Sequence, residues 1–182
     1  MGLKREYVIL QDTREKKPLL FPETILMLDE TKPPWFRRTV RVRLRVEKFP
    51  LKTGDYCLLG HESVGLVERK GSLREVAGYC LTKDGCRRFG SQVDRLKEEA
   101  ALPYLLLEGT PLDLLRATKY VEKPGLAMDS FQRFLLKKEI PLILLPAATA
   151  SARKSVGEWV ARLLINGVLT HGMESNDSGD GG

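Results

Sequence analysis

The sequence predicts an α/β fold, in which a mixed central sheet is flanked by helices. Two patterns lead to this class. Strand-like segments dominate the chain up to residue 70, and helical segments then alternate with short apolar strands. A chain of 182 residues with 42% hydrophobic residues fits one domain with a real core, so a wholly disordered chain is excluded. The absence of a fixed sequence repeat excludes collagen-like and solenoid folds.

The expected elements follow in chain order. Runs of apolar, β-branched and aromatic residues between proline- and glycine-rich loops predict the first strands, at residues 7–12, 39–48, 56–59 and 64–70. Later helices are expected at 72–80, 89–101 and 128–138, and later strands at 104–108 and 141–145. A last helix is expected from about 151 to 165, because Val156, Trp159, Val160, Leu163 and Leu164 form one apolar stripe at helical spacing.

The domain organisation follows from these elements. We expect one folded domain over residues 1–170 and a disordered tail over 171–182. The end of that tail, ESNDSGDGG, is too polar and too rich in glycine to fold by itself. The longest apolar stretch, residues 140–150, contains two prolines and is too short to cross a bilayer, so no membrane segment is expected.

Cysteine usage bears on the compartment. Cys57, Cys80 and Cys86 are odd in number and form no C-x-x-C pair, which argues against both a disulfide framework and a zinc site. The first residues carry no apolar run long enough for a secretory signal. We therefore expect an intracellular protein, in the cytoplasm of a prokaryote or of a virus-infected host cell, or in a nucleus.

The positive charge is concentrated in one segment. The chain holds 30 basic and 24 acidic residues, a net charge of +6, and residues 32–48 alone contain seven basic residues and one acidic residue. Within the expected strand at 39–48, Arg41, Arg43 and Arg45 alternate with apolar residues and share one face. This face is either an ordinary solvated strand surface or a ridge that contacts nucleic-acid phosphates.

Two aromatic residues precede the basic strand in the loop TKPPWFRR. Trp35 and Phe36 could stack on an unpaired nucleic-acid base beside the arginines. The alternative, which is at least as common for loop aromatics, is that they anchor the loop on the core.

The strand VGLVERK has the most informative end. Its apolar run on both faces indicates a central strand, and period two places Glu68 and Lys70 on one face and Arg69 on the other. A turn at Gly54 lets Asp55 approach the end of this strand. Two carboxylates and a lysine can thus converge at a strand end, which is the arrangement of a metal-dependent phosphodiesterase.

Hydrolysis of a phosphodiester explains these residue types, because the attacking water, the phosphate and the leaving oxygen are all electron-rich. Mg²⁺ prefers oxygen ligands, which Asp55 and Glu68 can supply. The ion would polarise a phosphate oxygen and lower the pKa of a bound water, while Lys70 neutralises charge or orients the water. Each piece alone is a weak signal, because E-R-K is often a solvated charge triplet and G-D-Y an ordinary turn.

Taken together and in order, GDY and ERK resemble the signature G-D-x and E-R-K-x-x-x-D of the nuclease domain of the XPF family of structure-selective endonucleases. Three further segments, VILQDTRE, RRFGSQVDRLK and YLLLEG, also resemble segments of that domain, and the resemblance covers about residues 7–165. It implies the restriction-endonuclease-like fold and dependence on Mg²⁺ or Mn²⁺. It also implies cleavage of branched, flapped or junction DNA, in DNA repair or recombination.

The resemblance also implies roles for single residues. Asp55, Glu68 and Asp12 would be the metal-site acids, and Lys70 the partner of the water or phosphate. The supporting residues would be Arg14, Glu15, Arg69, Arg88 and Gln92, with Arg69 assigned to the catalytic group. Arg14, Arg88 and Gln92 are assigned to DNA binding together with the basic strand. Surface ion pairs or a plain helix face remain the alternatives for these supporting residues.

The chain departs from the family pattern at one position of the motif. Arg74 stands where the pattern has Asp. Ser72 and Glu75 fit a capping box, in which a carboxylate at the third helical position bonds back to the N-cap amide. If Gly71 is an extra residue, Glu75 takes the place of the displaced acid at the start of the helix.

A second departure concerns substrate grip. No tandem helix-hairpin-helix module is seen, so we expect grip on DNA from the nuclease domain itself, from a homodimer, or from a partner in a heterodimer. The competing function is a catalytically silent DNA-binding or scaffold subunit of a nuclease complex. The retained acids favour an enzyme. A small nuclease of another kind on the same scaffold is a third possibility, since fold alone does not define activity.

Overall fold

The computed structural model describes residues 4, 6–36, 38–146 and 149–177. A seven-stranded sheet has the order β2-β3-β1-β4-β5-β6-β7. Its strands are β1 (Glu6–Asp12), β2 (Thr24–Leu28), β3 (Thr39–Phe49), β4 (Tyr56–Leu58), β5 (Gly65–Lys70), β6 (Leu102–Glu108) and β7 (Leu142–Leu145). The helices are η1 (Pro34–Phe36), α1 (Leu73–Cys80), α2 (Lys83–Glu99), α3 (Pro111–Leu114), α4 (Pro124–Lys138) and α5 (Ala150–Asp177).

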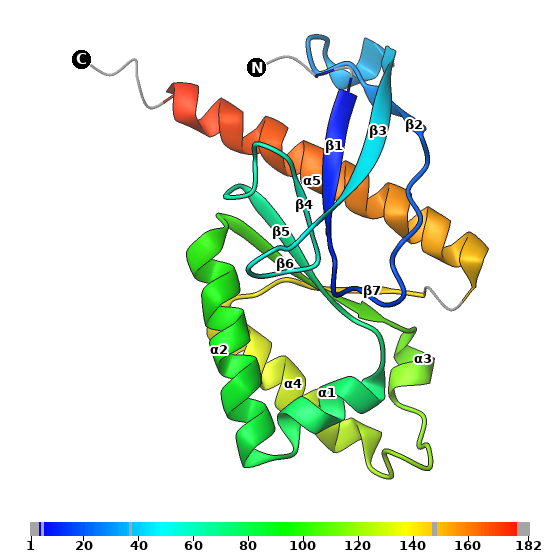
Figure 1. Cartoon of the computed structure of the whole chain (residues 1–182), viewed down its shortest axis with the longest axis vertical. Coiled ribbons are helices and arrows are strands. Elements are labelled where there is room, and N and C mark those ends of the chain that lie inside the picture. The colour runs from blue at the N-terminus through cyan, green and yellow to red at the C-terminus, as the bar shows by residue number, and fades with distance from the viewer. Residues whose placement is uncertain (1–3, 5, 37, 147–148, 178–182) are drawn as a thin grey trace.

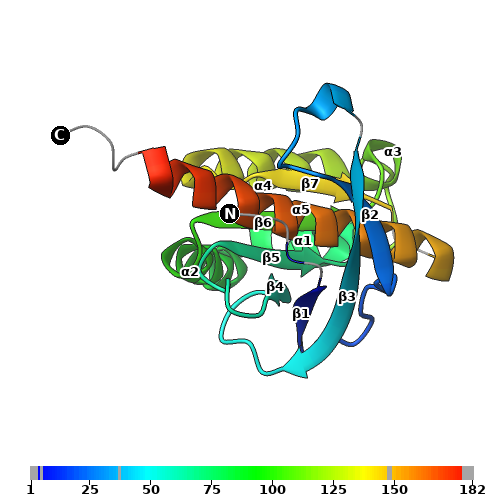
Figure 2. The ribbon, with the colours of Figure 1, turned by 90° about the horizontal axis from the view of Figure 1, so that it is seen from above.

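The sheet separates two helical layers (Figures 1 and 2). The long helix α5 packs on one face, where Val160, Leu164 and other buried residues of α5 meet the inward side chains of β1, β2 and β3. Helices α1, α2 and α4 pack on the other face around Phe89 and Phe131. The predicted α/β class, with a mixed sheet flanked by helices, is therefore confirmed.

Strand β5 is the centre of this arrangement. All six of its residues are buried, and it pairs with β4 in antiparallel and with β6 in parallel orientation. The sequence predicted a central strand covered on both faces, and the structure confirms it. Its polar last residues, Glu68 to Lys70, are therefore held rigidly inside the fold.

Several elements differ from the sequence expectation: η1 and α3 were not predicted, and α4 begins at Pro124 rather than 128. For two others the local reason is clear. Strand β2 was not predicted, because TILML is short and lies next to prolines, yet Ile25 and Met27 are buried in regular alternation. Helix α2 begins at Lys83 rather than 89, because the Thr82 side chain caps it by accepting from the Gly85 amide. The polar first turns of α2 carry little apolar periodicity and therefore hide its start.

The last helix is longer than predicted. Helix α5 runs to Asp177, so residues 171–177 are helical where a disordered tail was expected, and residues 178–182 lie outside the described residues. Buried Val168 and Leu169 continue the apolar stripe beyond 165, which explains the extension. Trp159 lies on the predicted apolar stripe, but it is 39% exposed and is therefore not a core residue. None of the helices in the described residues has the length and apolar character needed to span a bilayer.

Candidate active site

Three carboxylates lie in one row across neighbouring strands. The register of β1, β4 and β5 continues one step past β4 to Asp12, Asp55 and Glu68. Backbone bonds hold this row, since the Asp12 amide donates to the Asp55 carbonyl (2.9 Å) and the Asp55 amide donates to the Val67 carbonyl (2.8 Å). Paired residues project from the same face, and adjacent strands are roughly 4.8 Å apart, so the three side chains are close neighbours.

Gly54 makes this row possible. Its φ of 76° lies in the left-handed region, and a Cβ at this position would lie 2.6 Å from the Leu66 side chain. A side chain would therefore be excluded both by backbone strain and by the close approach to β5. The sequence predicted that a turn at Gly54 brings Asp55 to the end of the strand, and the structure shows this placement.

Asp55 is a partly buried acid whose pKa is raised. One carboxylate oxygen accepts from the Arg69 amide at 2.7 Å. Burial and the neighbouring Glu68 carboxylate nevertheless raise the pKa of Asp55 to about 7. The Glu68 carboxylate repels the negative charge of Asp55, which disfavours ionisation of Asp55. Asp55 is therefore protonated more readily than an ordinary aspartate.

Lys70 faces the same side as Glu68. Its ammonium is buried and donates to the Glu68 carboxylate (2.7 Å) and to the Gln92 side-chain oxygen (3.1 Å). It also lies 4.7 Å from the centre of the Tyr79 ring. Burial opposes the charge on Lys70, but Glu68 and Glu75 outweigh burial and raise its pKa above the ordinary lysine value. The ammonium is therefore kept protonated in a fixed position.

The start of α1 contributes Glu75. Ser72 is the N-cap, and its hydroxyl accepts from the Glu75 amide, which is the predicted first half of a capping box. The second half differs, because the Glu75 carboxylate accepts from the Gly71 amide (3.0 Å) rather than from that of the cap residue. The other carboxylate oxygen lies 3.6 Å from the Lys70 ammonium. Glu75 thus adds a fourth acid to the edge of the site.

Asp12 differs from the other acids because it is already bonded to Arg14. Its side-chain oxygens accept from the Arg14 amide (3.0 Å) and from the Arg14 guanidinium (2.7 Å). Burial acts against its charge, but these bonds outweigh burial and lower the pKa of Asp12. Among the described residues, no group of three or more Asp, Glu, His or Cys side chains is arranged to hold a metal ion as it stands. Asp55 and Glu68 are close enough for the Glu68 charge to raise the pKa of Asp55.

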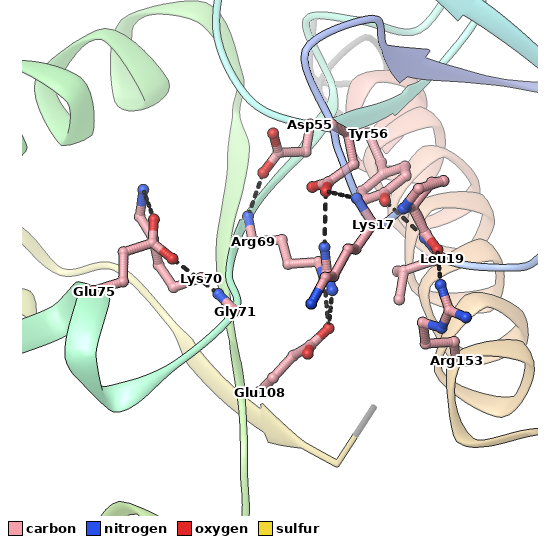
Figure 3. Close-up of polar contacts among 12 residues, drawn as sticks. Lys17, Leu19, Asp55, Tyr56, Arg69, Lys70, Gly71, Glu75, Glu108 and Arg153 are labelled. Carbon is pink, nitrogen blue, oxygen red and sulfur yellow. Dashed lines mark hydrogen bonds and ion pairs between the residues drawn. The ribbon is translucent and has the colours of Figure 1, made fainter. Parts of the chain in front are cut away.

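Arg69 lies on the opposite face of β5 (Figure 3). Its guanidinium pairs with Glu15 (3.1 Å) and with Glu108, and all three side chains are nearly buried. The surface ion pair considered for Glu15 is in fact an interior one. Glu108 was missed by the sequence analysis. It stands at the carboxyl end of β6, which is parallel to β5, so the position at a shared sheet edge was the available signal.

The row opens into a cleft of about 1170 Å³. Basic residues line its walls, namely Arg14, Lys16, Lys17, Lys52, Arg95 and Arg153. The Thr53 hydroxyl, also in this lining, is buried and has no hydrogen-bond partner among the described residues. Except for Arg14, these residues were not singled out by the sequence analysis, because they come from separate segments with no motif spacing.

The wall that contains Lys17 is anchored on α5 (Figure 3). The Leu19 amide donates to the Tyr56 hydroxyl at 2.9 Å, and the Arg153 guanidinium donates to the Pro18 carbonyl at 3.5 Å. At Gly157 of α5 an added Cβ would lie 2.3 Å from the Leu20 carbonyl oxygen, so only glycine permits this contact. The loop after β1 is therefore a packed wall of the cleft.

The residues predicted to bind DNA fall into three places. Arg14 and Gln92 line the cleft. Arg88 is exposed on α2, where it lines a shallow pocket together with Arg74. The three arginines of β3 are exposed and do not line the cleft; they are Arg41, Arg43 and Arg45.

Comparisons with known proteins bear on the fold. No family model and no curated protein sequence matches the chain. XPF from Aeropyrum pernix in complex with DNA is a structural match with 20% identity and a TM-score of 0.52, over 86% of this chain and 64% of that one. Another structure of XPF from Aeropyrum pernix matches with 19% identity and a TM-score of 0.51, over 82% and 59%. The chain spans about three fifths of the length of these proteins, and it shares with them the restriction-endonuclease-like fold.

Proposed function

We propose that this chain is a metal-dependent DNA endonuclease that hydrolyses phosphodiester bonds, with branched, flapped or junction DNA as its substrate. One observation carries the proposal: the carboxylates of Asp12, Asp55 and Glu68 lie in one row beside the Lys70 ammonium, at a cleft with basic walls. The shared fold with XPF, which has been solved in complex with DNA, supports DNA as the substrate class.

The acids fit Mg²⁺ or Mn²⁺. Asp55 and Glu68 supply the hard oxygen donors that these ions prefer. A cation beside them would favour the charged form of Asp55, which burial and Glu68 disfavour. We expect these two residues to hold the ion, with Asp12 contributing if Arg14 releases it. When bound, such an ion polarises a phosphate oxygen and lowers the pKa of a coordinated water.

The remaining side chains act on the substrate itself. Glu68 and Glu75 favour the charged form of Lys70, and Gln92 accepts a hydrogen bond from it. Lys70 therefore serves as a hydrogen-bond donor to developing negative charge rather than as a base. Arg14, whose side chain is 68% exposed, can reach a phosphate while it bonds to Asp12. Arg69 bonds to acids on the far face and acts as a positioning residue for β5. Association with a second copy or a partner protein remains a prediction.

The test is cleavage by the purified full chain. Labelled flap, fork, nicked and linear duplexes are incubated with Mg²⁺, Mn²⁺ or EDTA. Asp55→Asn and Glu68→Gln are compared with the control Asp129→Asn, which removes an exposed acid on α4. We expect cutting of branched DNA that needs the metal. It should fall by roughly a hundredfold or more in both site variants, the scale of losing a preorganised electrostatic group, and remain in the control.

Two results would overturn the proposal. Cutting that persists in EDTA, or that survives in both site variants, would place the chemistry elsewhere. Binding of branched DNA by the wild-type chain without any cutting would instead support the silent DNA-binding subunit. Circular dichroism of each variant shows whether a lost activity reflects a lost fold.

A further inference from the structure

The outer face of β3 carries unpaired positive charge. Along this strand Val42 and Leu44 are buried, whereas Arg41, Arg43 and Arg45 alternate with them and are exposed. We call these three residues the arginine ridge. The side chains of Arg41 and Arg43 make no hydrogen bond or ion pair within the described residues. Arg45 pairs with two exposed acids, Glu6 at 3.6 Å and Glu47 at 3.0 Å.

The ridge leads to the carboxylate row. Strand β3 is parallel to β1, with Arg45 opposite Val8 and Phe49 opposite Asp12. Paired residues of parallel strands project from the same face, so the ridge and the row share one face of the sheet. At roughly 3.3 Å per residue, Arg41 lies about 26 Å along the strand from Phe49. The strand therefore forms an exposed track that ends beside the acids.

Helices do not cover this track. The arginine ridge and Phe49 are exposed, and in Figure 1 β3 lies between β1 and β2, away from α1, α2 and α4. Exposed apolar side chains accompany the charges. Phe49 is 51% exposed at the end near the site, and Trp35 and Phe36 are 77% and 67% exposed just before the first residue of β3. Trp35 and Phe36 are thus not core anchors, which was the alternative left open by the sequence.

We propose that the arginine ridge binds a single-stranded arm of the DNA whose junction lies in the cleft; this inference rests on the proposed nuclease function. A strand of positive charges with exposed aromatic rings at both ends is the arrangement that single-stranded nucleic acids occupy, with phosphates on arginines and bases on rings. In this proposal the arginine ridge binds the phosphates, and Phe49 contacts a base where the single strand leaves the carboxylate row.

Charge decides against a second copy of the chain as the occupant. In a two-fold dimer through this face, the same arginines would approach one another from both subunits, which is repulsive. Among the described residues, the nearby acids Glu6 and Glu47 pair with Arg45 and not with Arg41 or Arg43, so the charges of these two arginines are not neutralised. A polyanion fits this surface better than an equally basic protein does.

The test is binding in EDTA, where metal-dependent cutting is blocked, by the full-length chain. One duplex carries a single-stranded tail of about 15 nucleotides, within the length that such platforms bind, and a second duplex is blunt. The variant Arg41→Gln/Arg43→Gln/Arg45→Gln is compared with Lys123→Gln/Arg133→Gln/Lys137→Gln. The control removes the same charge from exposed residues at the start and along the length of α4, outside the cleft.

We expect the ridge variant to bind tailed DNA at least tenfold more weakly and blunt DNA as the wild type does. Its log-log salt slope for tailed DNA should fall by about 2, at roughly 0.7 per phosphate of a single strand. The control should keep the preference for the tail. An unchanged tail preference in the ridge variant would overturn the proposal, and binding of a protein ligand instead would then be the explanation to pursue.

Trp35 supplies an independent readout. In a Trp159→Phe background Trp35 is the single tryptophan, and we expect tailed DNA to quench its fluorescence while blunt DNA does not. The ridge variant should lose this quenching. Cleavage separates the two proposals. A chain that cuts nothing but still prefers tailed DNA in EDTA refutes the nuclease and keeps the ridge. A chain that cuts flaps without any tail preference does the reverse.

Discussion

Each face of β5 carries a basic residue among acids, but the two groups differ in how the acids are paired. On the α5 side, the Arg69 guanidinium is enclosed by Glu15 and Glu108. On the α1 and α2 side, Lys70 stands among Glu68, Glu75 and the rest of the carboxylate row. Figure 3 shows the Arg69 and Lys70 side chains extending to opposite sides of the strand.

This difference in pairing distinguishes a structural ion-pair cluster around Arg69 from a candidate active site around Lys70. Arg69 uses its donors on two acids, and the cluster is saturated, as a buried ion pair must be if it is to persist. The row on the other face has an acid whose pKa is raised to about 7. Both groups of residues line the same cleft, which also contains the Thr53 hydroxyl that has no partner among the described residues. We therefore interpret the row as a binding site and the Arg69 cluster as structural support for β5.

The largest expected effect on stability concerns the ion-pair cluster of Arg69, Glu15 and Glu108. Arg69→Met should lower the free energy of unfolding by about 3–5 kcal/mol, because it leaves two acids buried without their cation. Denaturant melts measure it. The triple variant Arg69→Met/Glu15→Gln/Glu108→Gln removes the stranded charges and should recover much of the loss. If Arg69→Met is as stable as the wild type, the cluster does not support the strand.

Asp55 tests the open face through pH. Its pKa is raised in the folded state, so the native protein binds this proton more tightly than the unfolded chain does. The stability it contributes is therefore lost as the pH rises from about 4 to about 7. In EDTA, Asp55→Asn should flatten this slope and raise the melting temperature at pH 8 by roughly 5 °C. A variant that melts below the wild type at pH 8 would show that the folded state does not disfavour the charged form of Asp55.

Glu75 gives the smallest effect. Glu75→Gln weakens the contact with Lys70 and the bond to the Gly71 amide, and should reduce stability by less than about 1 kcal/mol. Cleavage should fall by a few-fold, because Lys70 loses one of the acids that keep it charged and in place. The control Glu98→Gln changes an exposed acid on α2. If Glu75→Gln matches this control in both stability and cleavage, then Glu75 does not replace the missing Asp of the motif.

Local signals in the sequence predicted much of the site. Alternation identified β3 and the buried β5, and a single glycine identified the turn before Asp55, because each depends on neighbouring residues. Helix α1 was found through Ser72 for the same reason. Strand β2 was not predicted, because a five-residue edge strand carries little periodic signal. The start of helix α2 was missed, because its first turns are polar.

The sequence by itself determined which residues alternate, turn and cap, and therefore that Glu68 and Lys70 share a face. Only the tertiary structure decided that Glu108 pairs with Arg69 and that Arg14 bonds to Asp12. It also decided that the arginine ridge lies outside the cleft, on the same face of the sheet as the carboxylates. The physical reason is strand order. The sheet places β1 between β3 and β4, and pairing between segments far apart in the chain is not encoded by any local pattern.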